Sequence, residues 1–216
     1  MSAKPDRVLS GWRARRLIGN GGLLVRDGLA FRMYLRADTR SSRSGRVPAH
    51  VVARLKQAPG LAVFCGDPDR LVAAGKVEAL PLKPLPVPVE IFPHRRSQDS
   101  ALEQVVRTDT QGVRLRAAAA RFRADYHLAA SPGRLRTDAP KTLAAACARL
   151  AAMEVSLGTD QVELVEMLVL DKLTPAALLH VAEAGQPEVR EALVGLAIAY
   201  GLAGPDQDAG RAFASA

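Results

Sequence analysis

Several residue types that catalytic and metal sites require are scarce in this chain of 216 residues. It contains two cysteines, four histidines and 4% aromatic residues. The cysteines, Cys65 and Cys147, lie far apart in apolar surroundings, which is typical of buried thiols in a reducing compartment. No His-x-x-x-His, Cys-x-x-Cys or Gly-x-Ser-x-Gly motif occurs, so zinc and serine-nucleophile sites have no support. We therefore expect no enzyme activity, no cofactor and no small-molecule substrate.

Long apolar segments are also missing. The chain has no run of about 18 apolar residues, the length that a membrane-spanning helix requires. Residues 1–19 lack the apolar stretch of a secretory signal peptide, although their basic residues leave an organelle-targeting segment open. We expect a cytoplasmic protein that has no membrane partner.

Charge, in contrast, is plentiful and unevenly distributed. Lys and Arg number 30 against 22 Asp and Glu, for a net charge of +8. Residues 1–80 carry a net +9 and residues 81–150 a net +6, whereas residues 151–216 carry a net −7. Such asymmetry indicates an anionic partner for the basic part, most often nucleic acid, and hence association with the nucleoid.

Prolines at positions 81, 84, 86, 88 and 93 mark a boundary. Proline removes backbone donors and favours an extended chain, so residues 81–98 are predicted to be a linker. A ligand for a polyproline-binding module is the alternative. The predicted fold class is α+β, with a winged-helix-like domain at residues 1–80, a helical domain at residues 99–204 and a flexible tail at residues 205–216.

The N-terminal domain is predicted from a helix at residues 7–18, a hairpin, a second helix at residues 48–57 and a second hairpin. Asp27 and Gly28 lie between two apolar runs and predict a type I′ turn. In the strand that follows, Leu29, Phe31, Met33 and Leu35 should face the core. The alternate positions, Arg32 and Arg36 among them, should form a basic face. The second hairpin joins residues 61–65 to residues 70–73.

Residues 36–46, RADTRSSRSGR, predict an arginine-rich loop that either follows a phosphate backbone or is simply solvated. In the helix at residues 48–57, Arg54 and Lys56 should point outward. The candidate nucleic-acid ligands are the basic residues of the first helix, the loop and the second helix: Arg13, Arg15, Arg16, Arg36, Arg40, Arg43, Arg46, Arg54 and Lys56.

The C-terminal domain is predicted to be helical throughout. One helix covers residues 100–129 and buries a face with helical spacing, while its arginines lie on other faces. A second helix covers residues 142–153. Asp160 is expected to cap a third helix at residues 161–170, with Glu163 completing a capping box. The buried face of the first helix is formed by Leu115, Ala119, Phe122 and Tyr126.

Residues 174–200 predict a helix-turn-helix. Thr174 can cap a helix that has Pro175 in its first turn, and a second helix starts at Pro187 after the turn at residues 184–186. The start of the second helix enters the major groove in DNA-binding proteins, where it needs cationic or amide side chains. Here it carries Glu188, Arg190 and Glu191, which favours contact with a protein.

Residues 164–200 resemble region 4 of bacterial sigma factors, with an apolar helix, a turn at residues 171–174 and two short helices in this order. The sequence departs from that pattern at Glu188 and Glu191. Three segments, RFRADYHLA (121–129), VEMLVLDKLTPAALL (165–179) and EALVGLAIAYGL (191–202), also resemble the alphaproteobacterial gene transfer agent activation factors. The resemblance implies a regulator of a phage-derived gene cluster that acts through RNA polymerase.

Two mechanisms fit this resemblance. One is an elongation or antitermination factor that docks on RNA polymerase, alone or with elongation factors, while the basic domain holds DNA or nascent RNA; we favour this one. The other is a promoter activator, which needs base readout from the N-terminal domain. A helix-turn-helix protein of DNA packaging or partition and a structural adaptor are further alternatives. The candidate polymerase contacts are Glu188, Arg190, Glu191, Arg114 and Arg121.

Overall fold

The computed structural model describes residues 7–36, 39–40, 42–57, 61–64, 67–73, 100–130 and 139–202. It contains helices and an antiparallel sheet, which confirms the predicted α+β class. The chain divides into two compact units. The sheet unit comprises Met1–Arg96 and Asp125–Arg149, and the helical unit comprises Ser97–Ala124 and Leu150–Ala216. The predicted linker and tail lie outside the described residues, and no described helix is long and apolar enough to cross a membrane.

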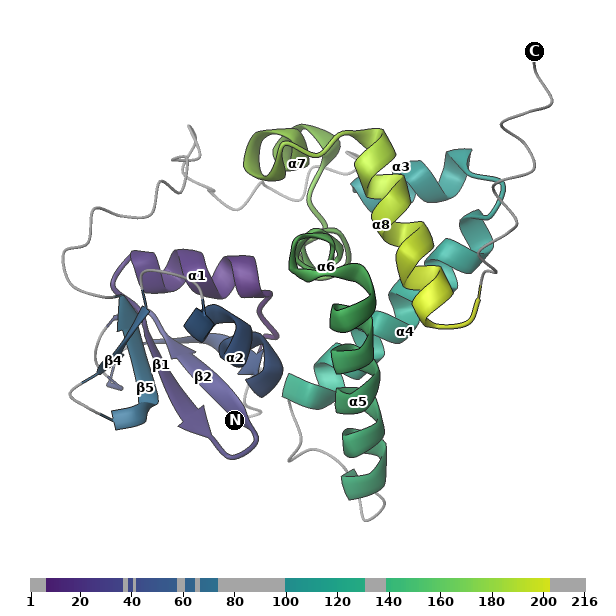
Figure 1. The fold of residues 1–216 in the computed structure, drawn as a ribbon. Helices are drawn as coiled ribbons and strands as arrows, with labels where there is room; N and C mark the ends of the chain where they lie inside the picture. The colour runs from purple at the N-terminus through teal and green to yellow at the C-terminus, as the bar shows by residue number, and fades with distance from the viewer. Residues whose placement is uncertain are drawn as a thin grey trace, which may run out of the picture. The chain divides into compact units, whose positions relative to one another are not determined.

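The sheet unit contains five antiparallel strands in the order β3-β2-β1-β5-β4 (Figure 1). Helix α1 contacts β5 and α2, and α2 contacts β2, β3 and β4. The helices are α1 (Gly11–Gly19) and α2 (Ala49–Gln57). The strands are β1 (Leu23–Asp27), β2 (Ala30–Tyr34), β3 (Arg43–Pro48), β4 (Leu61–Phe64) and β5 (Asp67–Ala73).

Helix α1 starts four residues later than predicted. The Ser10 side chain accepts a hydrogen bond from the Arg13 amide at 3.1 Å and caps the helix. The residues before it pair with β3, because the Leu9 amide donates to the Arg46 carbonyl at 2.9 Å and the Arg46 amide donates to the Arg7 carbonyl at 2.8 Å. This approach requires Gly45, where a Cβ would clash with the Arg7 carbonyl oxygen.

The first hairpin is present, but its turn is shifted by one residue. Asp27 pairs with Ala30, so Gly28 and Leu29 form the turn, and only Gly28 has a positive φ, of 67°. A glycine at the first central position is typical of a type II′ turn, so the predicted type I′ turn is wrong. Leu29 is therefore 60% exposed, and Leu35 beyond the strand is 44% exposed. Phe31 and Met33 are buried as predicted.

Two further expectations about this unit need correction. The predicted loop at residues 36–46 is not a loop throughout, because β3 begins at Arg43 and pairs with β2. The predicted basic face of β2 is not fully open, since Ala30 and Tyr34 on that face are buried. The second hairpin is confirmed by the pairing of Leu61 with Ala73.

Within the described residues, the helical unit is formed from six α-helices and a π-helix, two of which, α4 and α5, also contribute residues to the sheet unit. The elements are α3 (Ala101–Thr108), α4 (Gly112–Ala130), α5 (Ala139–Leu157), α6 (Thr159–Glu166), the π-helix η2 (Met167–Asp171), α7 (Pro175–Ala182) and α8 (Gln186–Ala199).

The predicted single helix at residues 100–129 is two helices, α3 and α4. The chain breaks at Asp109, whose Oδ1 accepts a hydrogen bond from the Gln111 amide at 2.7 Å. Gly112 then lies so close to the Val106 carbonyl that a Cβ there would clash. The predicted inner face is confirmed, since its four members are at most 3% exposed: Leu115, Ala119, Phe122 and Tyr126.

Two local predictions in this part of the chain are wrong. Helix α6 has Gly158 as its N-cap with no side-chain cap bond, so the capping box of Asp160 and Glu163 does not form. The helix continues into the π-helix η2, which ends at Lys172 in the left-handed conformation with φ 53°. Cys147 is exposed on α5 instead of buried; Cys65 lies outside the described residues.

Candidate protein and nucleic-acid interfaces

The predicted helix-turn-helix is present as α7 and α8 in the helical unit. Thr174 Oγ1 accepts a hydrogen bond from the Ala177 amide at 3.3 Å, and Pro175 occupies the first turn of α7, as predicted. Helix α8 contacts both α3 and α6. Of the residues expected on its inner side, Val189, Leu193 and Leu196 are at most 3% exposed, whereas Tyr200 is half-buried. The motif is therefore a packed part of the unit.

The acidic start of α8 has a structural role at Glu188. Its Oε2 accepts a hydrogen bond from the Gly185 amide at 2.8 Å, which forms one half of a capping box. The negative charge also lies at the positive end of the helix dipole. Glu188 is otherwise exposed, so the same carboxylate stabilises α8 and contributes to the surface.

Replacing Glu188 by alanine should lower the free energy of unfolding by about 1 kcal/mol, because the Gly185 amide loses its acceptor at the helix end. Chemical denaturation followed by circular dichroism would measure this loss. Glu191→Ala is the matched control, since Glu191 is exposed one turn further along α8 and caps nothing. Equal stability of the two variants would contradict the capping role.

Arg190 is partly exposed, but its guanidinium is bound within the helical unit. Its Nε lies 2.6 Å from Asp109 Oδ2, and the Asp109 side chain is 6% exposed while that of Arg190 is 43% exposed. Burial favours the protonated acid and raises the pKa of Asp109. The hydrogen bond from the Gln111 amide and the bond and charge of Arg190 outweigh that effect, so the pKa of Asp109 is below its ordinary 3.8. Arg190 thus links α8 to the turn between α3 and α4.

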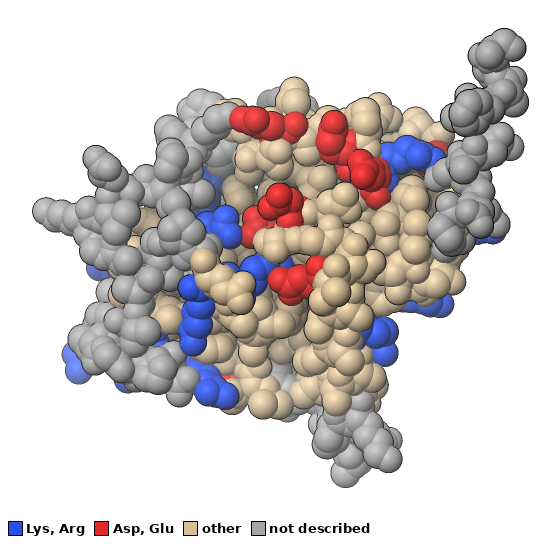
Figure 2. All heavy atoms as spheres, in the orientation of Figure 1, with Lys and Arg blue, Asp and Glu red and all other residues tan. Residues whose placement is uncertain are grey.

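The other predicted polymerase contacts are exposed. Glu191 accepts a hydrogen bond from Gln161 Nε2 at 3.4 Å, a long contact that leaves the carboxylate accessible. Arg114 and Arg121 are exposed on α4, and Arg121 Nη1 donates to the Tyr200 carbonyl at 3.3 Å. Figure 2 shows acidic side chains gathered on this face of the helical unit. Residues 159–202 contain seven Asp and Glu, of which Glu166 is buried, against two Lys and Arg. The exposed acids lie on α6, just after α7 and at the start of α8, so this surface favours a basic partner.

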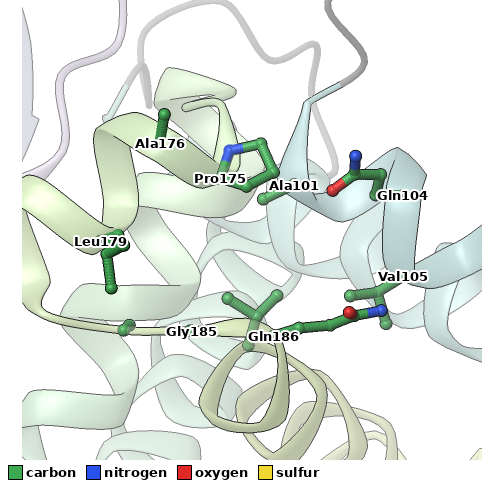
Figure 3. Close-up of a pocket in the computed structure, with 10 residues that line it drawn as sticks. Ala101, Gln104, Val105, Pro175, Ala176, Leu179, Gly185 and Gln186 are labelled. Atoms are coloured by element: carbon green, nitrogen blue, oxygen red, sulfur yellow. The ribbon is translucent and has the colours of Figure 1, made fainter.

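An apolar pocket of about 260 Å³ lies between α3, α7 and the start of α8 (Figure 3). Val105 and Val189 are buried at its base, whereas Leu179 is 61% exposed at its edge. Gln104 and Gln186 are the only polar side chains among the residues that line it. The pocket therefore offers apolar contact area within the acidic surface of the helical unit.

The predicted nucleic-acid ligands of the sheet unit do not form one cluster. Arg13, Arg15 and Arg16 are half-buried on α1, where Arg16 lies 5.7 Å from the centre of the Trp12 ring. Arg36, Arg40 and Arg43 are exposed, as is Lys56 on α2. Arg54 is a correction: it is 6% exposed and therefore does not point outward. Helix α2 thus presents one of its two predicted cations to solvent.

The sheet brings Arg46 together with a residue outside the set of candidate ligands, Arg32. Arg46 Nη2 lies 2.8 Å from Asp27 Oδ2, and Arg32 Nε donates to the same oxygen at 3.1 Å. Strand pairing also places Val25 opposite Arg32 on one side and Arg70 on the other. The alternation of side chains along β2 indicated Arg32, but the contribution of Arg70 depends on the pairing of β1 with β5, which the sequence does not reveal.

The two interfaces differ in what they can bind. The described residues contain no group of three His, Cys, Asp or Glu side chains that could hold a metal ion. What they contain is a helix-turn-helix with an acidic surface and a sheet with several arginines.

No protein-family model, no curated protein and no solved structure matches this chain.

Proposed function

We propose that this protein is a transcription regulator that acts through RNA polymerase, with the helical unit in contact with the polymerase and the sheet unit in contact with nucleic acid. The observation that carries the proposal is the environment of Arg190. It is the only Lys or Arg in residues 175–199, and it is bound to Asp109. A helix-turn-helix that offers Glu188 and Glu191 but no unengaged cation is unsuited to DNA phosphates and suited to a protein surface.

The partition of charge supports two separate partners. The basic residues concentrate in residues 1–150, and the acidic surface is formed by residues of α6, the turn after α7 and the start of α8. Opposite charges on two units of one chain allow it to hold an anionic polymer and a basic protein surface at once. We propose that this arrangement keeps the protein at the nucleoid, in the cytoplasm.

Within this proposal we favour an elongation or antitermination factor of a phage-derived, gene transfer agent type gene cluster. A promoter activator needs base readout, and Arg54, one of the residues expected to supply it, is buried. The winged-helix character of residues 1–80 remains part of the proposal: α2 followed by the β4–β5 hairpin favours it. Phosphate contact without base readout suits a factor that moves with the polymerase.

The test is co-purification of the tagged protein from its own cells after nuclease treatment, with mass spectrometry of what is retained. We expect RNA polymerase subunits together with elongation factors. Polymerase without those factors would favour promoter activation. No polymerase would contradict the proposal; recovery of a multimer or of DNA-packaging proteins would then favour the packaging alternative, and neither would favour the adaptor.

Replacing Glu191 by lysine should reduce the recovery of polymerase about tenfold, because a like charge at a complementary interface costs more than 1 kcal/mol. Glu191 is the appropriate site because it is exposed and caps no helix. Glu154→Lys is the matched control: it makes the same charge change in the helical unit, at a half-buried residue of α5 outside the acidic surface. Quantitative mass spectrometry of both variants would measure the difference, and an equal loss would reduce the effect to net charge.

A further inference from the structure

One face of the sheet carries a row of arginines that runs across the strands. Helix α2 lies on the opposite face, because Lys56 Nζ is 5.9 Å from the centre of the Phe31 ring. Side chains alternate along a strand, so Arg32 points away from α2. Arg46 pairs with Arg32, Val25 pairs with Arg32, and Arg70 pairs with Val25. Directly paired residues share a face, so the three arginines lie together.

The row is continuous across four strands. Neighbouring strands are about 4.8 Å apart, so the row from Arg46 to Arg70 extends for about 14 Å. Beyond a register shift between Met33 and Tyr34, Arg43 pairs with Tyr34, and its pairing places it on the face of Arg32. We call Arg32, Arg43, Arg46 and Arg70 the arginine face.

Asp27 is the acidic residue that the described contacts place on this face. A single oxygen, Oδ2, accepts bonds from both Arg32 and Arg46. One carboxylate shared by two guanidinium groups leaves a net positive charge, and it holds both groups in position. Asp27 is 38% exposed, so it can be approached by an anion that competes for the same two arginines.

We propose that the arginine face is a binding site for single-stranded nucleic acid, a refinement that rests on the proposed function. Both α1, which contacts α2, and α2 itself lie on the other side, so no described helix on this face can enter a duplex groove. Phosphates of a single strand fit a row of cations on a flat surface. Val25 is half-buried between Arg32 and Arg70 and offers apolar contact to an unstacked base.

The test uses the full chain and two labelled probes, a 20-nucleotide single strand and a duplex of the same length, in fluorescence anisotropy over a salt series. We expect tighter binding of the single strand. Arg70→Gln should weaken the affinity for the single strand about fivefold near physiological salt. It should also make the slope of log affinity against log salt concentration shallower by about 0.7, the value of one lost phosphate contact. Arg70 is exposed, so this variant should fold normally.

Two further variants make the test specific. Asp27→Asn should tighten binding of the single strand about threefold, because a competing carboxylate is removed from Arg32 and Arg46. Arg26→Gln is the matched control: it removes an exposed arginine next to Val25 on β1, on the opposite face. We expect little change in its affinity.

The outcomes separate this inference from the proposed function. Equal losses in Arg26→Gln and Arg70→Gln, a preference of the wild type for duplex, or an unchanged affinity of Arg70→Gln would each overturn the arginine face as a single-strand site. In those cases polymerase recovery would be retained and the proposed function would stand. The inference also fails if the wild-type protein binds neither the single strand nor the duplex but co-purifies with an acidic protein. If no polymerase co-purifies with the wild-type protein, the proposed function is overturned instead.

Discussion

Asp109→Ala should lower the free energy of unfolding by about 3 kcal/mol. The carboxylate accepts hydrogen bonds from the Gln111 amide at 2.7 Å and from Arg190 at 2.6 Å. The bond from Arg190 to the charged carboxylate contributes about 1.5 to 3 kcal/mol, and the loss of the acceptor for the Gln111 amide costs about 1 kcal/mol. The side chain is 6% exposed, so water replaces neither bond fully. Urea denaturation at neutral pH would measure the change.

A double-mutant cycle with Arg190→Ala separates the ion pair from the hydrogen bond that the Gln111 amide donates to Asp109. Arg190→Ala should cost about 2 kcal/mol, less than Asp109→Ala, because Asp109 keeps its bond from Gln111. We expect a coupling energy of about 1 to 2 kcal/mol between the two positions. Additive effects of the two substitutions would contradict a direct pair.

The same pair makes stability depend on pH. The pKa of Asp109 is lowered in the folded state, so the stabilisation that its carboxylate provides is complete at neutral pH and is lost as the pH falls below 3.8.

This pair changes the interpretation of Arg190. The sequence places Arg190 between two exposed acids at a helix start, which favoured a contact with polymerase. In the structure its guanidinium belongs to the packing of α8 against the turn between α3 and α4. Arg190→Ala should therefore reduce polymerase recovery only to the extent that it unfolds the protein, unlike Glu191→Lys.

The sequence predicts the parts of the fold that depend on nearby residues and on the helical or strand spacing of apolar side chains. Thr174 and Pro175 mark the start of α7, because a cap and a first-turn proline act within a few residues. The spacing of Leu115, Phe122 and Tyr126 identifies the buried face of α4, because the helical period alone determines it. The helix-turn-helix and both hairpins follow from the same kind of signal.

The errors arise where a distant partner decides the local structure. The strand at Arg43–Pro48 was missed because it pairs with β2 and with the residues before α1, and its polar sequence does not indicate a strand. Arg54 was expected to be exposed and Arg190 to be available to a partner, because charged side chains usually lie at the surface. Whether a charge is exposed depends on the elements that pack around it, and the sequence did not reveal these.

Acidification should destabilise the sheet unit through His50. Burial, and secondarily the charge of Arg54, lowers the pKa of His50 from 6.5 to about 4. The ring lies edge-on to Tyr126, with centroids 5.8 Å apart, and the Tyr126 hydroxyl donates to the Leu9 carbonyl at 2.9 Å. His50 is thus neutral in the folded protein at neutral pH, in a position where a proton is unfavourable.

The sign of the effect follows from proton binding. Below pH 6.5 the unfolded chain protonates His50 and the folded protein does not, so acid favours the unfolded state. The contribution of neutral His50 to the free energy of unfolding is fully present above pH 6.5. Below that pH it falls by about 1.4 kcal/mol per pH unit down to pH 4, a loss of about 3 kcal/mol in all. Denaturation curves at several pH values between 7 and 4 would measure this slope.

Carboxylates elsewhere also respond to acid, so the slope must be assigned to His50 by comparison. His50→Gln removes the titrating group, and the difference between the wild type and this variant should decline with the slope given above. His127→Gln is the matched control, since His127 is exposed on α4 and should leave the wild-type slope unchanged. Parallel slopes for the wild type and His50→Gln would mean that His50 takes up a proton in the folded protein. Its packing against Tyr126 would then have to open in acid, because a charged imidazole beside Arg54 is not tolerated when buried.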